Sequence, residues 1–472
     1  MSDTLMVSVS GVRGLVGTDL TPEVVAGWAA AFGVWARAGK GDGGRGKGKP
    51  RVVLGRDART SGPMFANAAS AGLVSVGCDV IDVGLVATPT VQLAVEHHRA
   101  AGGIILTASH NPIEWNALKF VGPDGIFLDT GAGTRVRELA AGGENSLPRA
   151  TYNAIGGVEA DGDAISRHLA AVLALRRVDV RAIRRRRFRV ALDTVRGAGG
   201  ALMPELFERL GCRVSAINLE TDGLFPRPPE PVPENLKALG ALVRRSKADI
   251  GIAVDPDVDR LAIVDEKGRP IGEDYTLALA IRAVLGKRDG GRGKGTTVVC
   301  NLSTSLVVED AAKEFGARVV RAPVGEAHVA RKIIELKAAI GGEGNGGVMY
   351  PALHVGRDGP VAAALVLSLL ARERATVSEL VARAPRYTIV KAKVERGTRN
   401  AERMDRVYVA LRARFPEANV DVQDGLRLAW PDRWLHVRPS GTEPIIRLIA
   451  EAPSSADAER LIEEGRRLCA AS

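Results

Sequence analysis

The sequence has few cysteines, no long apolar run and no leader-like beginning. Its four cysteines, widely spaced along the chain, exclude a disulfide framework or a CxxC zinc site and fit a reducing compartment. They are Cys78, Cys212, Cys300 and Cys469. The longest apolar stretch, near Val361–Ala371, is interrupted by Ser368 and is too short to span a bilayer. Residues 1–4 lack the basic and then apolar pattern of a signal peptide, so we expect a cytoplasmic protein without a membrane partner.

Aromatic residues are also scarce, at 4% of the chain, which leaves little surface for stacking nucleic-acid bases. The net charge is +10, and such a balance suits nucleic acid, an anionic surface or phosphorylated small molecules. Part of the basic excess lies in three runs, at Lys40–Arg51, Arg181–Arg189 and Lys287–Lys294. The first and third runs contain no aromatic residue. We therefore interpret the runs as solvated loops and expect no nucleic-acid partner.

What is present is a strand–helix–strand pattern that occurs three times. Each copy has a short apolar strand, a helical stretch that ends at glycine, a second strand, and then a third strand after an alanine-rich segment. The three first strands begin at Arg51, Arg189 and Thr297, and the third strands lie at 104–106, 250–254 and, more weakly, 338–340. Units of this kind form parallel sheets with right-handed crossovers.

From about residue 374 the pattern changes to alternating strands with a helix near 401–415 and a last helix after Ser455. We therefore predict an α/β protein of three similar α/β domains, with mixed and mostly parallel sheets, plus a C-terminal α+β domain. The predicted domains are 1–153, 154–254, 255–373 and 374–472, with the loop 255–260 at the second boundary.

The residues that directly follow each third strand include many side chains that could react or bind ligands. It reads T-A-S-H-N-P at 107–112, D-P-D-V-D-R at 255–260 and G-E-G-N-G-G at 342–347. Ligands of open α/β sheets bind beyond the carboxyl ends of the strands, so three equivalent loops indicate one site shared between domains.

The alternation of Asp255, Asp257 and Asp259 lets three carboxylates of an extended loop converge on one point. Carboxylates so close repel one another unless a cation lies among them, and Mg²⁺ is the default cation for phosphate chemistry. A solvated acidic turn is the alternative. An EF-hand is excluded because Arg260 stands where that loop needs glycine.

Three other positions remain ambiguous from the residues alone. Ser109, beside His110, is either an exposed nucleophile or a turn residue. The R-P-S-G-T-E-P segment at 438–444 is either a phosphate cradle or a polar turn. Glu343, in a glycine-dense loop, is either a sugar ligand or a loop cap.

Together these four loops resemble the α-D-phosphohexomutase superfamily, which includes phosphoglucomutases, phosphomannomutases and phosphoglucosamine mutases. The resemblance covers essentially the whole chain and extends to S-G-V-R-G at 10–14. It implies four domains around a central cleft. It also implies an isomerase that interconverts hexose 6-phosphate and hexose 1-phosphate through a phosphoserine enzyme and a 1,6-bisphosphate intermediate, which also serves as activator.

The resemblance also implies a role for each motif residue. Ser109 would be the phosphoserine, and with Asp255, Asp257 and Asp259 it would complete the Mg²⁺ site. Arg13 and Lys119 would be the basic residues at the transferring phosphate, flanked by His110 and Arg260. Glu343 and Asn345 would face the sugar hydroxyls. The non-reacting phosphate would be held by four residues of the 438–444 segment, namely Arg438, Ser440, Gly441 and Thr442.

Two departures from the family pattern bear on the substrate, and a third bears on the metal loop. Asn345 and Gly347 stand where many members have serine and histidine, and this form resembles a prokaryotic branch usually labelled phosphoglucosamine mutase. We therefore favour glucosamine phosphate, with glucose or mannose phosphate as alternatives. Pro256 replaces a more usual glycine but removes no carboxylate, so metal binding should survive. We expect a monomer or a homodimer that binds a phosphosugar.

Two other classes of function stay open at this point. A Mg²⁺-dependent phosphatase would release free phosphate and would tolerate loss of Ser109. A nucleic-acid-binding or scaffold protein that uses the basic loops would bind with a steep salt dependence and would tolerate Asp257→Ala.

Overall fold

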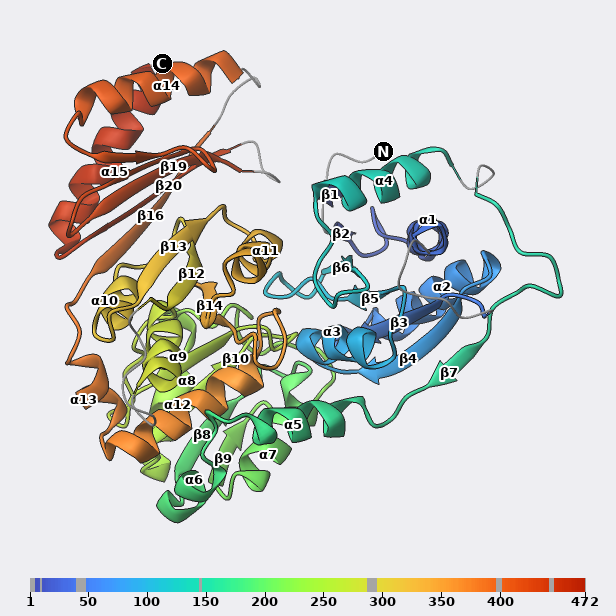
Figure 1. Ribbon diagram of the computed structural model, residues 1–472, viewed down its shortest axis with the longest axis horizontal. Helices are drawn as coiled ribbons and strands as arrows, with labels where there is room; N and C mark the ends of the chain where they lie inside the picture. Colours follow the sequence, from blue (N-terminus) through green and yellow to red (C-terminus); the bar gives the residue numbers. More distant parts are fainter. Residues whose placement is uncertain are drawn as a thin grey trace.

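The computed structural model describes residues 5–8, 11–39, 48–143, 147–286, 295–395, 401–440 and 445–471, the side chains of 401, 402 and 471 excepted. Figure 1 shows four units that follow one another along the chain, each built on one sheet. Three sheets mix parallel and antiparallel strands and are accompanied by helices, while the fourth is antiparallel throughout. This confirms the predicted fold class. Among the described residues, no helix has both the length and the apolar character needed to cross a membrane.

The first unit contains a seven-stranded sheet in the order β1-β2-β6-β5-β3-β4-β7. Its strands are β1 (Met6–Ser8), β2 (Gly11–Leu15), β3 (Arg51–Arg56), β4 (Asp79–Leu85), β5 (Gly102–Leu106), β6 (Trp115–Val121) and β7 (Val158–Ala160), and its helices are α1 (Pro22–Ala38), α2 (Gly62–Ser75), α3 (Thr88–His97) and α4 (Thr130–Ala141). Strands β5, β3, β4 and β7 run parallel, while β6 turns back along β5 and β2 turns back along β6. Residues 107–114 therefore form the turn between β5 and β6.

The second unit contains a four-stranded sheet in the order β11-β10-β8-β9. Its elements are α5 (Ala164–Ala174), α6 (Val180–Arg186), β8 (Arg189–Asp193), α7 (Gly199–Arg209), β9 (Arg213–Ile217), a 3₁₀ turn (Pro233–Asn235), α8 (Lys237–Ser246), β10 (Ile250–Val254) and β11 (Leu261–Val264). Strand β11 returns antiparallel along β10, so residues 255–260 form a turn inside this sheet. The predicted boundary after residue 254 thus falls between two paired strands, because a six-residue turn carries the chain straight back along β10.

The third unit repeats this arrangement with the order β13-β12-β14-β15. Its elements are α9 (Asp274–Leu285), β12 (Thr297–Asn301), α10 (Val307–Lys313), β13 (Arg318–Ala322), α11 (Glu326–Leu336), β14 (Ile340–Glu343), β15 (Gly347–Met349), α12 (Gly359–Glu373) and α13 (Val377–Val381). Strand β15 again returns antiparallel along the third parallel strand, β14. The weak third strand expected at 338–340 is therefore real, and it begins at Ile340.

The fourth unit is a five-stranded antiparallel sheet in the order β16-β20-β19-β18-β17. Its elements are β16 (Thr388–Glu395), α14 (Ala401–Arg414), β17 (Asn419–Asp421), β18 (Leu426–Ala429), β19 (Trp434–Pro439), β20 (Ile445–Ala452) and α15 (Ser455–Ala471). In Figure 1 both helices lie on the side of this sheet that faces away from the third unit.

The glycines expected to end the first helix of each repeat do so. Gly77, Gly211 and Gly316 have φ of +80°, +71° and +68°, a left-handed conformation that glycine adopts without a Cβ penalty. The second strand of each copy begins within two residues of this glycine. The three turns after the third strands therefore stand at equivalent places in the three sheets.

The second and third units share one hydrophobic core. Helix α12 packs against α5, α6 and α9, and one continuous cluster joins residues such as Leu202, Ile252 and Leu367. The first unit has a separate cluster on each face of its sheet, and the fourth has its own core. The turns at 255–260 and 342–347 are therefore carried by one packed body, while Ser109 comes from a neighbouring one.

Candidate active site

Ser109 lies in the turn after β5 with a left-handed backbone. Its φ is +49°, which is uncommon for a residue with a side chain, and the side chain is buried. Its hydroxyl donates a hydrogen bond to Asp255 Oδ2 at 2.8 Å, and its backbone N–H donates to Thr107 Oγ1 at 2.9 Å. The turn therefore presents one hydroxyl to the aspartate loop of the next unit.

A buried arginine holds the Ser109 turn in this shape. Arg59 follows β3 and donates to the backbone carbonyls of Ser109 and Asn111 through Nη2, at 2.7 and 2.6 Å. Its Nη1 donates to the carbonyls of Pro112 and Trp115, at 2.6 and 2.8 Å. Its Nε pairs with the buried Asp57 at 3.2 Å. A guanidinium has a rigid fork of donors, so one side chain fixes four carbonyls of the turn.

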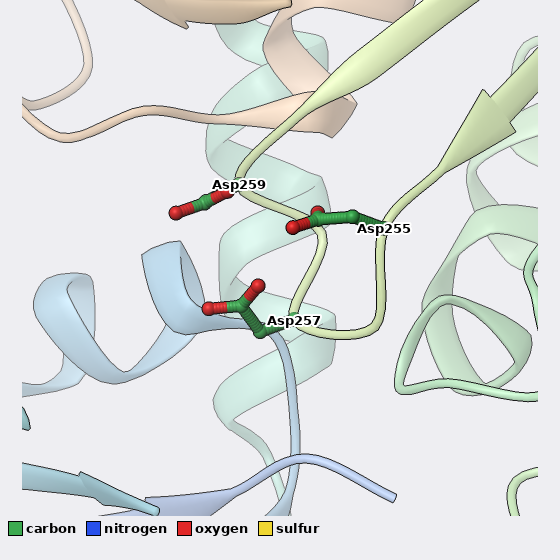
Figure 2. A group of neighbouring side chains, drawn as sticks. All are labelled: Asp255, Asp257 and Asp259. Carbon is green, nitrogen blue, oxygen red and sulfur yellow. The ribbon is translucent and has the colours of Figure 1, made fainter. Parts of the chain in front are cut away.

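The three aspartates of the turn between β10 and β11 point into the same space (Figure 2). One oxygen from each lies within 4.8 Å of the others, and all three side chains are buried. Oδ1 of Asp257 and Oδ1 of Asp259 accept no hydrogen bond from any described residue. Unsatisfied carboxylate oxygens at this depth are costly unless a cation takes them, so the residues present fit a hard divalent cation such as Mg²⁺.

The protonation of the loop follows from burial and mutual repulsion. Burial raises the pKa of Asp255 well above its usual range, and the negative charges of Asp257 and Asp259 raise it further. Burial also opposes ionisation of Asp257, but the Lys119 ammonium and the hydrogen bonds from Asp255, Lys119 and Thr88 together outweigh it and lower the pKa of Asp257. Protonation of the loop is therefore favoured at Asp255 rather than at Asp257, and a bound cation would favour the ionised form of Asp255.

Two cationic side chains of the first sheet lie beside the Ser109 turn and the aspartate loop. Arg13 on β2 and Lys119 on β6 lie on paired strands, with Arg13 opposite Ala117 and Lys119 opposite Gly11. This register places them on the same face of the sheet. Lys119 Nζ donates to Asp257 Oδ2 at 2.8 Å, and Arg13 Nη1 donates to Asn111 Oδ1 at 2.5 Å. Their positive charges therefore flank the Ser109 hydroxyl.

His110 and Arg260 lie beside this pair. The charge of Arg260 and then burial lower the pKa of His110 to about 2, so its imidazole is neutral at any working pH. Its buried Nδ1 accepts no hydrogen bond from the described residues. Arg260 pairs with Glu230 through Nη1 at 3.1 Å, and its backbone N–H donates to Asp255 Oδ1 at 3.1 Å.

Glu343 ends β14 and is buried in a dense set of donors. Its Oε1 accepts from Asn301 Nδ2 at 2.9 Å and from the Gly325 N–H at 3.1 Å, and its Oε2 accepts from Arg357 at 2.9 Å. Asn345 is half-buried, and its Oδ1 accepts from the Gly347 N–H at 3.2 Å. A carboxylate has about four acceptor positions, so Glu343 keeps capacity for one further hydroxyl.

The expected phosphate segment comes from the fourth unit. Arg438, near the end of β19, is half-buried and pairs with Asp424 at 3.0 Å, and Ser440 is buried. Gly441 and Thr442 lie outside the described residues. Asp424 in turn accepts from the Val324 N–H of the third unit at 3.1 Å. The segment is therefore tied to the third unit, which carries Glu343.

Comparison with known proteins agrees with this arrangement. The four domains of the phosphoglucomutase/phosphomannomutase family match residues 5–146, 166–268 and 272–387 (alpha/beta/alpha domains I, II and III) and 389–468 (the C-terminal domain). A phosphoglucomutase/phosphomannomutase of Thermococcus kodakarensis is 40% identical over 97% of both chains. The chain belongs to the phosphoglucomutase/phosphomannomutase family.

Further relatives support the same assignment. A probable phosphoglucosamine mutase of Methanopyrus kandleri is 36% identical over 96% of this chain and 95% of its own. The crystal structure of a family protein from Burkholderia thailandensis superposes with a TM-score of 0.83 at 28% identity, covering 99% of this chain and 98% of that one. The resemblance read from the motifs is thus confirmed. The chain is a phosphohexomutase, an isomerase that moves a phosphoryl group within a hexose phosphate.

Two buried arginines of this phosphohexomutase site were missed in the sequence. Arg59 follows the first strand of its repeat, at the same sheet edge as Ser109, so the strand-end rule that selected Ser109 was a usable signal for it. Arg357 precedes α12, and no local pattern marks it. Thr88, at the start of α3, was missed as well, although its hydroxyl donates to Asp257 Oδ2 at 2.8 Å.

Proposed function

We propose that this phosphohexomutase uses Ser109 as the phosphoryl carrier and interconverts glucosamine 6-phosphate and glucosamine 1-phosphate. The assignment of Ser109 rests on its hydrogen bond to Asp255. Asp255 belongs to a buried aspartate loop that the cationic side chains of Arg13 and Lys119 flank. A mere turn serine would need neither the strained backbone nor the arginine that holds it.

The residues that would hold Mg²⁺ are Asp255, Asp257, Asp259 and an oxygen of phosphorylated Ser109. When bound, the ion would neutralise charge on the phosphoryl oxygens. Lys119 holds Asp257 ionised, and Thr88 fixes the direction of the same carboxylate. Because burial and the neighbouring carboxylates raise the pKa of Asp255, binding of the cation would favour its ionised form.

The reaction has two symmetrical halves. Phosphorylated Ser109 gives its phosphoryl group to the free hydroxyl of the hexose phosphate, forming a P–O bond to the sugar and breaking the bond to Ser109. The sugar, now a 1,6-bisphosphate, turns over and returns its other phosphate to Ser109. Arg13 and Lys119 stabilise the charge on the transferring group. The proton that the sugar hydroxyl loses ends on the leaving Ser109 oxygen, and the second half returns it to the sugar.

The rest of the site holds the sugar. Glu343 and Asn345 are assigned to the sugar hydroxyls, and Arg260 and His110 to the phosphate beside Ser109. Arg438 and Ser440, with Gly441 and Thr442, are assigned to the phosphate that does not react. Because the bisphosphate turns over, this segment must accept either phosphate in the same place. Contacts between the fourth and third units place this segment beside the unit that carries Glu343.

The substrate is tested by ³¹P NMR with Mg²⁺ and a trace of hexose 1,6-bisphosphate. Glucosamine, glucose and mannose 6-phosphate are followed in separate tubes for a new 1-phosphate signal. Fastest conversion of the glucosamine compound is expected from the Asn345 and Gly347 form of the sugar loop. Faster conversion of glucose or mannose phosphate would overturn this preference and would follow the name of the Thermococcus relative. Free phosphate as the sole product would indicate a phosphatase.

We infer a cytoplasmic location and a monomer or a homodimer. The four cysteines are free thiols and three of them are buried, which suits a reducing compartment. Light scattering after size exclusion distinguishes a monomer of 49.8 kDa from a dimer of twice that mass. A larger assembly would contradict the expectation.

A further inference from the structure

Arg357 lies between the aspartate loop (residues 255–260) and the sugar loop (residues 342–347). Each nitrogen of its guanidinium donates to a different carboxylate. Its Nη2 donates to Asp259 Oδ2 at 2.5 Å, and its Nη1 donates to Glu343 Oε2 at 2.9 Å. Its Nε donates to Glu326 Oε2 at 3.0 Å. Arg357 is thus the shared partner of a proposed metal ligand and a proposed sugar ligand.

All four side chains of this cluster are buried, with exposed fractions of 8% for Arg357, 0% for Asp259, 3% for Glu343 and 7% for Glu326. The carboxylates come from separate elements: the turn before β11, the end of β14 and the start of α11. Charges at this depth are stable only when they are paired and hydrogen-bonded. The fork therefore restrains the distance and angle between three carboxylates that come from three different elements.

The stem of Arg357 fills the space beside Gly347, the first residue of β15. A Cβ at position 347 would lie 2.3 Å from Cδ and 2.9 Å from Cγ of Arg357. The end of a flexible side chain could move away, but this stem is fixed because three carboxylates bind its guanidinium. Residue 347 has no room for a side chain while Arg357 keeps these partners.

We propose that Arg357 is a positioning residue that fixes Asp259 and Glu343 relative to each other, and that Gly347 is required because the Arg357 stem occupies the place of a side chain there. The two positions are energetically coupled, and together they determine the conformation of the sugar loop. This inference rests on the proposed roles of Asp259 in metal binding and Glu343 in sugar binding.

Lysine cannot replace arginine in this role. An ammonium is a compact charge without the planar fork, so it can pair well with one of the three carboxylates but cannot hold all of them at fixed angles. In Arg357→Lys the charge is kept while the geometry is lost. The side chains of Asp259 in the aspartate loop and Glu343 in the sugar loop should therefore both lose their fixed positions.

The first test measures Mn²⁺ binding by electron paramagnetic resonance, with Mn²⁺ standing in for Mg²⁺. Arg357→Lys should weaken binding by roughly 10- to 100-fold, the usual effect of losing a residue that orients a metal ligand. It should also raise the KM for hexose phosphate, because Glu343 loses its support. Wild-type Mn²⁺ affinity and KM in this variant would overturn the proposal.

The matched control is Arg282→Lys. Arg282 is also buried in the third unit and pairs there with Glu314 and with the carbonyl of Leu380, away from the metal loop. This variant should lose thermal stability but keep the Mn²⁺ affinity of the wild type. Equal loss of Mn²⁺ affinity in both variants would reduce Arg357 to a general structural role and overturn the proposal.

A further variant, Asp257→Asn, tests the metal site itself. It separates the hypothesis that the aspartate loop binds the metal from the hypothesis that Arg357 positions Asp259. Strong loss of Mn²⁺ binding is expected in this variant. Unchanged binding would overturn the metal assignment and the Asp259 half of the present proposal with it.

The coupling with Gly347 is tested by a double-mutant cycle that needs no substrate or metal. Gly347→Ala should lower the Tm in the wild-type background, but should cost little in the Arg357→Ala background, where the stem is gone. Losses that simply add would overturn the coupling. The Arg357→Lys measurements keep the proposal falsifiable if the alanine variant does not fold.

Discussion

The hydroxyl of Ser109 donates to Asp255 Oδ2 at 2.8 Å, although the two residues are 146 positions apart in the chain. This hydrogen bond joins the first unit to the second at the place where both present a turn at the end of their third strand. Ser109 and the carboxylate loop are thus in direct contact, which is the preorganisation that the proposed phosphoryl transfer needs.

Ser109→Ala should abolish the mutase reaction. Without the hydroxyl no phosphoryl group can be carried, so turnover should fall by at least roughly 10³-fold. The check is the 1-phosphate signal in ³¹P NMR, together with intact mass for the added phosphate after incubation with hexose bisphosphate. Ser75→Ala, in helix α2 and away from the site, should keep both the 1-phosphate signal and the added phosphate. A Ser109→Ala enzyme that still accepts phosphate would contradict the assignment.

Arg59→Lys should lower kcat with little change in KM. A lysine can hold one or two of the four carbonyls that Arg59 binds, so the Ser109 turn should relax from its left-handed conformation. We expect a loss of roughly 10- to 100-fold in kcat, since small displacements at the reacting atom have effects of this size. Steady-state kinetics measure whether the change falls on kcat or on KM. A variant with raised KM and normal kcat would argue for a role in substrate binding instead.

Asp274→Asn should stabilise the protein increasingly as the pH rises. Burial raises the pKa of Asp274 to about 8, and its Oδ1 accepts the Ser305 N–H at 2.8 Å, a bond that an asparagine oxygen can keep. The folded state therefore binds a proton that the unfolded chain releases near pH 3.9. Wild-type stability falls between about pH 4 and 8, by up to about 1.4 kcal/mol per pH unit, and the asparagine variant escapes this loss.

Denaturant unfolding of both proteins between pH 5 and 9 measures this difference. The variant should gain over the wild type through this range and level off above about pH 8. Asp432→Asn, an exposed position of the fourth unit, serves as the control and should show a constant difference. A constant difference for Asp274→Asn as well would contradict the raised pKa.

Arg438→Ala should raise the KM for hexose 6-phosphate while leaving phosphorylation of Ser109 intact. Arg438 is assigned to the phosphate that does not react, and loss of a charge-assisted hydrogen bond to it costs about 1.5 to 3 kcal/mol, or roughly 10- to 150-fold in affinity. Arg433→Ala, at a half-buried position of the same unit whose side chain is 41% exposed, is the matched control. Unchanged KM in the Arg438 variant would remove this residue from the substrate site.

Much of this protein is determined by its sequence alone, because the signals are local. The glycines that end helices and the short apolar strands fix three α/β repeats, and the structure confirms all three. The turns after the third strands were found by the same rule, since parallel strands end at one edge of a sheet. Asp255, Asp257 and Asp259 needed only their alternation to be read as a possible metal loop, and the structure brings one oxygen from each within 4.8 Å of the others.

The tertiary structure decided how these turns are held and which of them touch. Arg59 and Arg357 act through hydrogen bonds to partners as far as 56 and 98 residues away. The end of a strand marks the place of Arg59 but not its partners, and no local pattern marks Arg357. The sequence also placed a boundary at residue 254, where the chain instead pairs β11 back onto β10. Local motifs specify which groups are available, whereas their separation and charge depend on burial and on contacts between units distant in the chain.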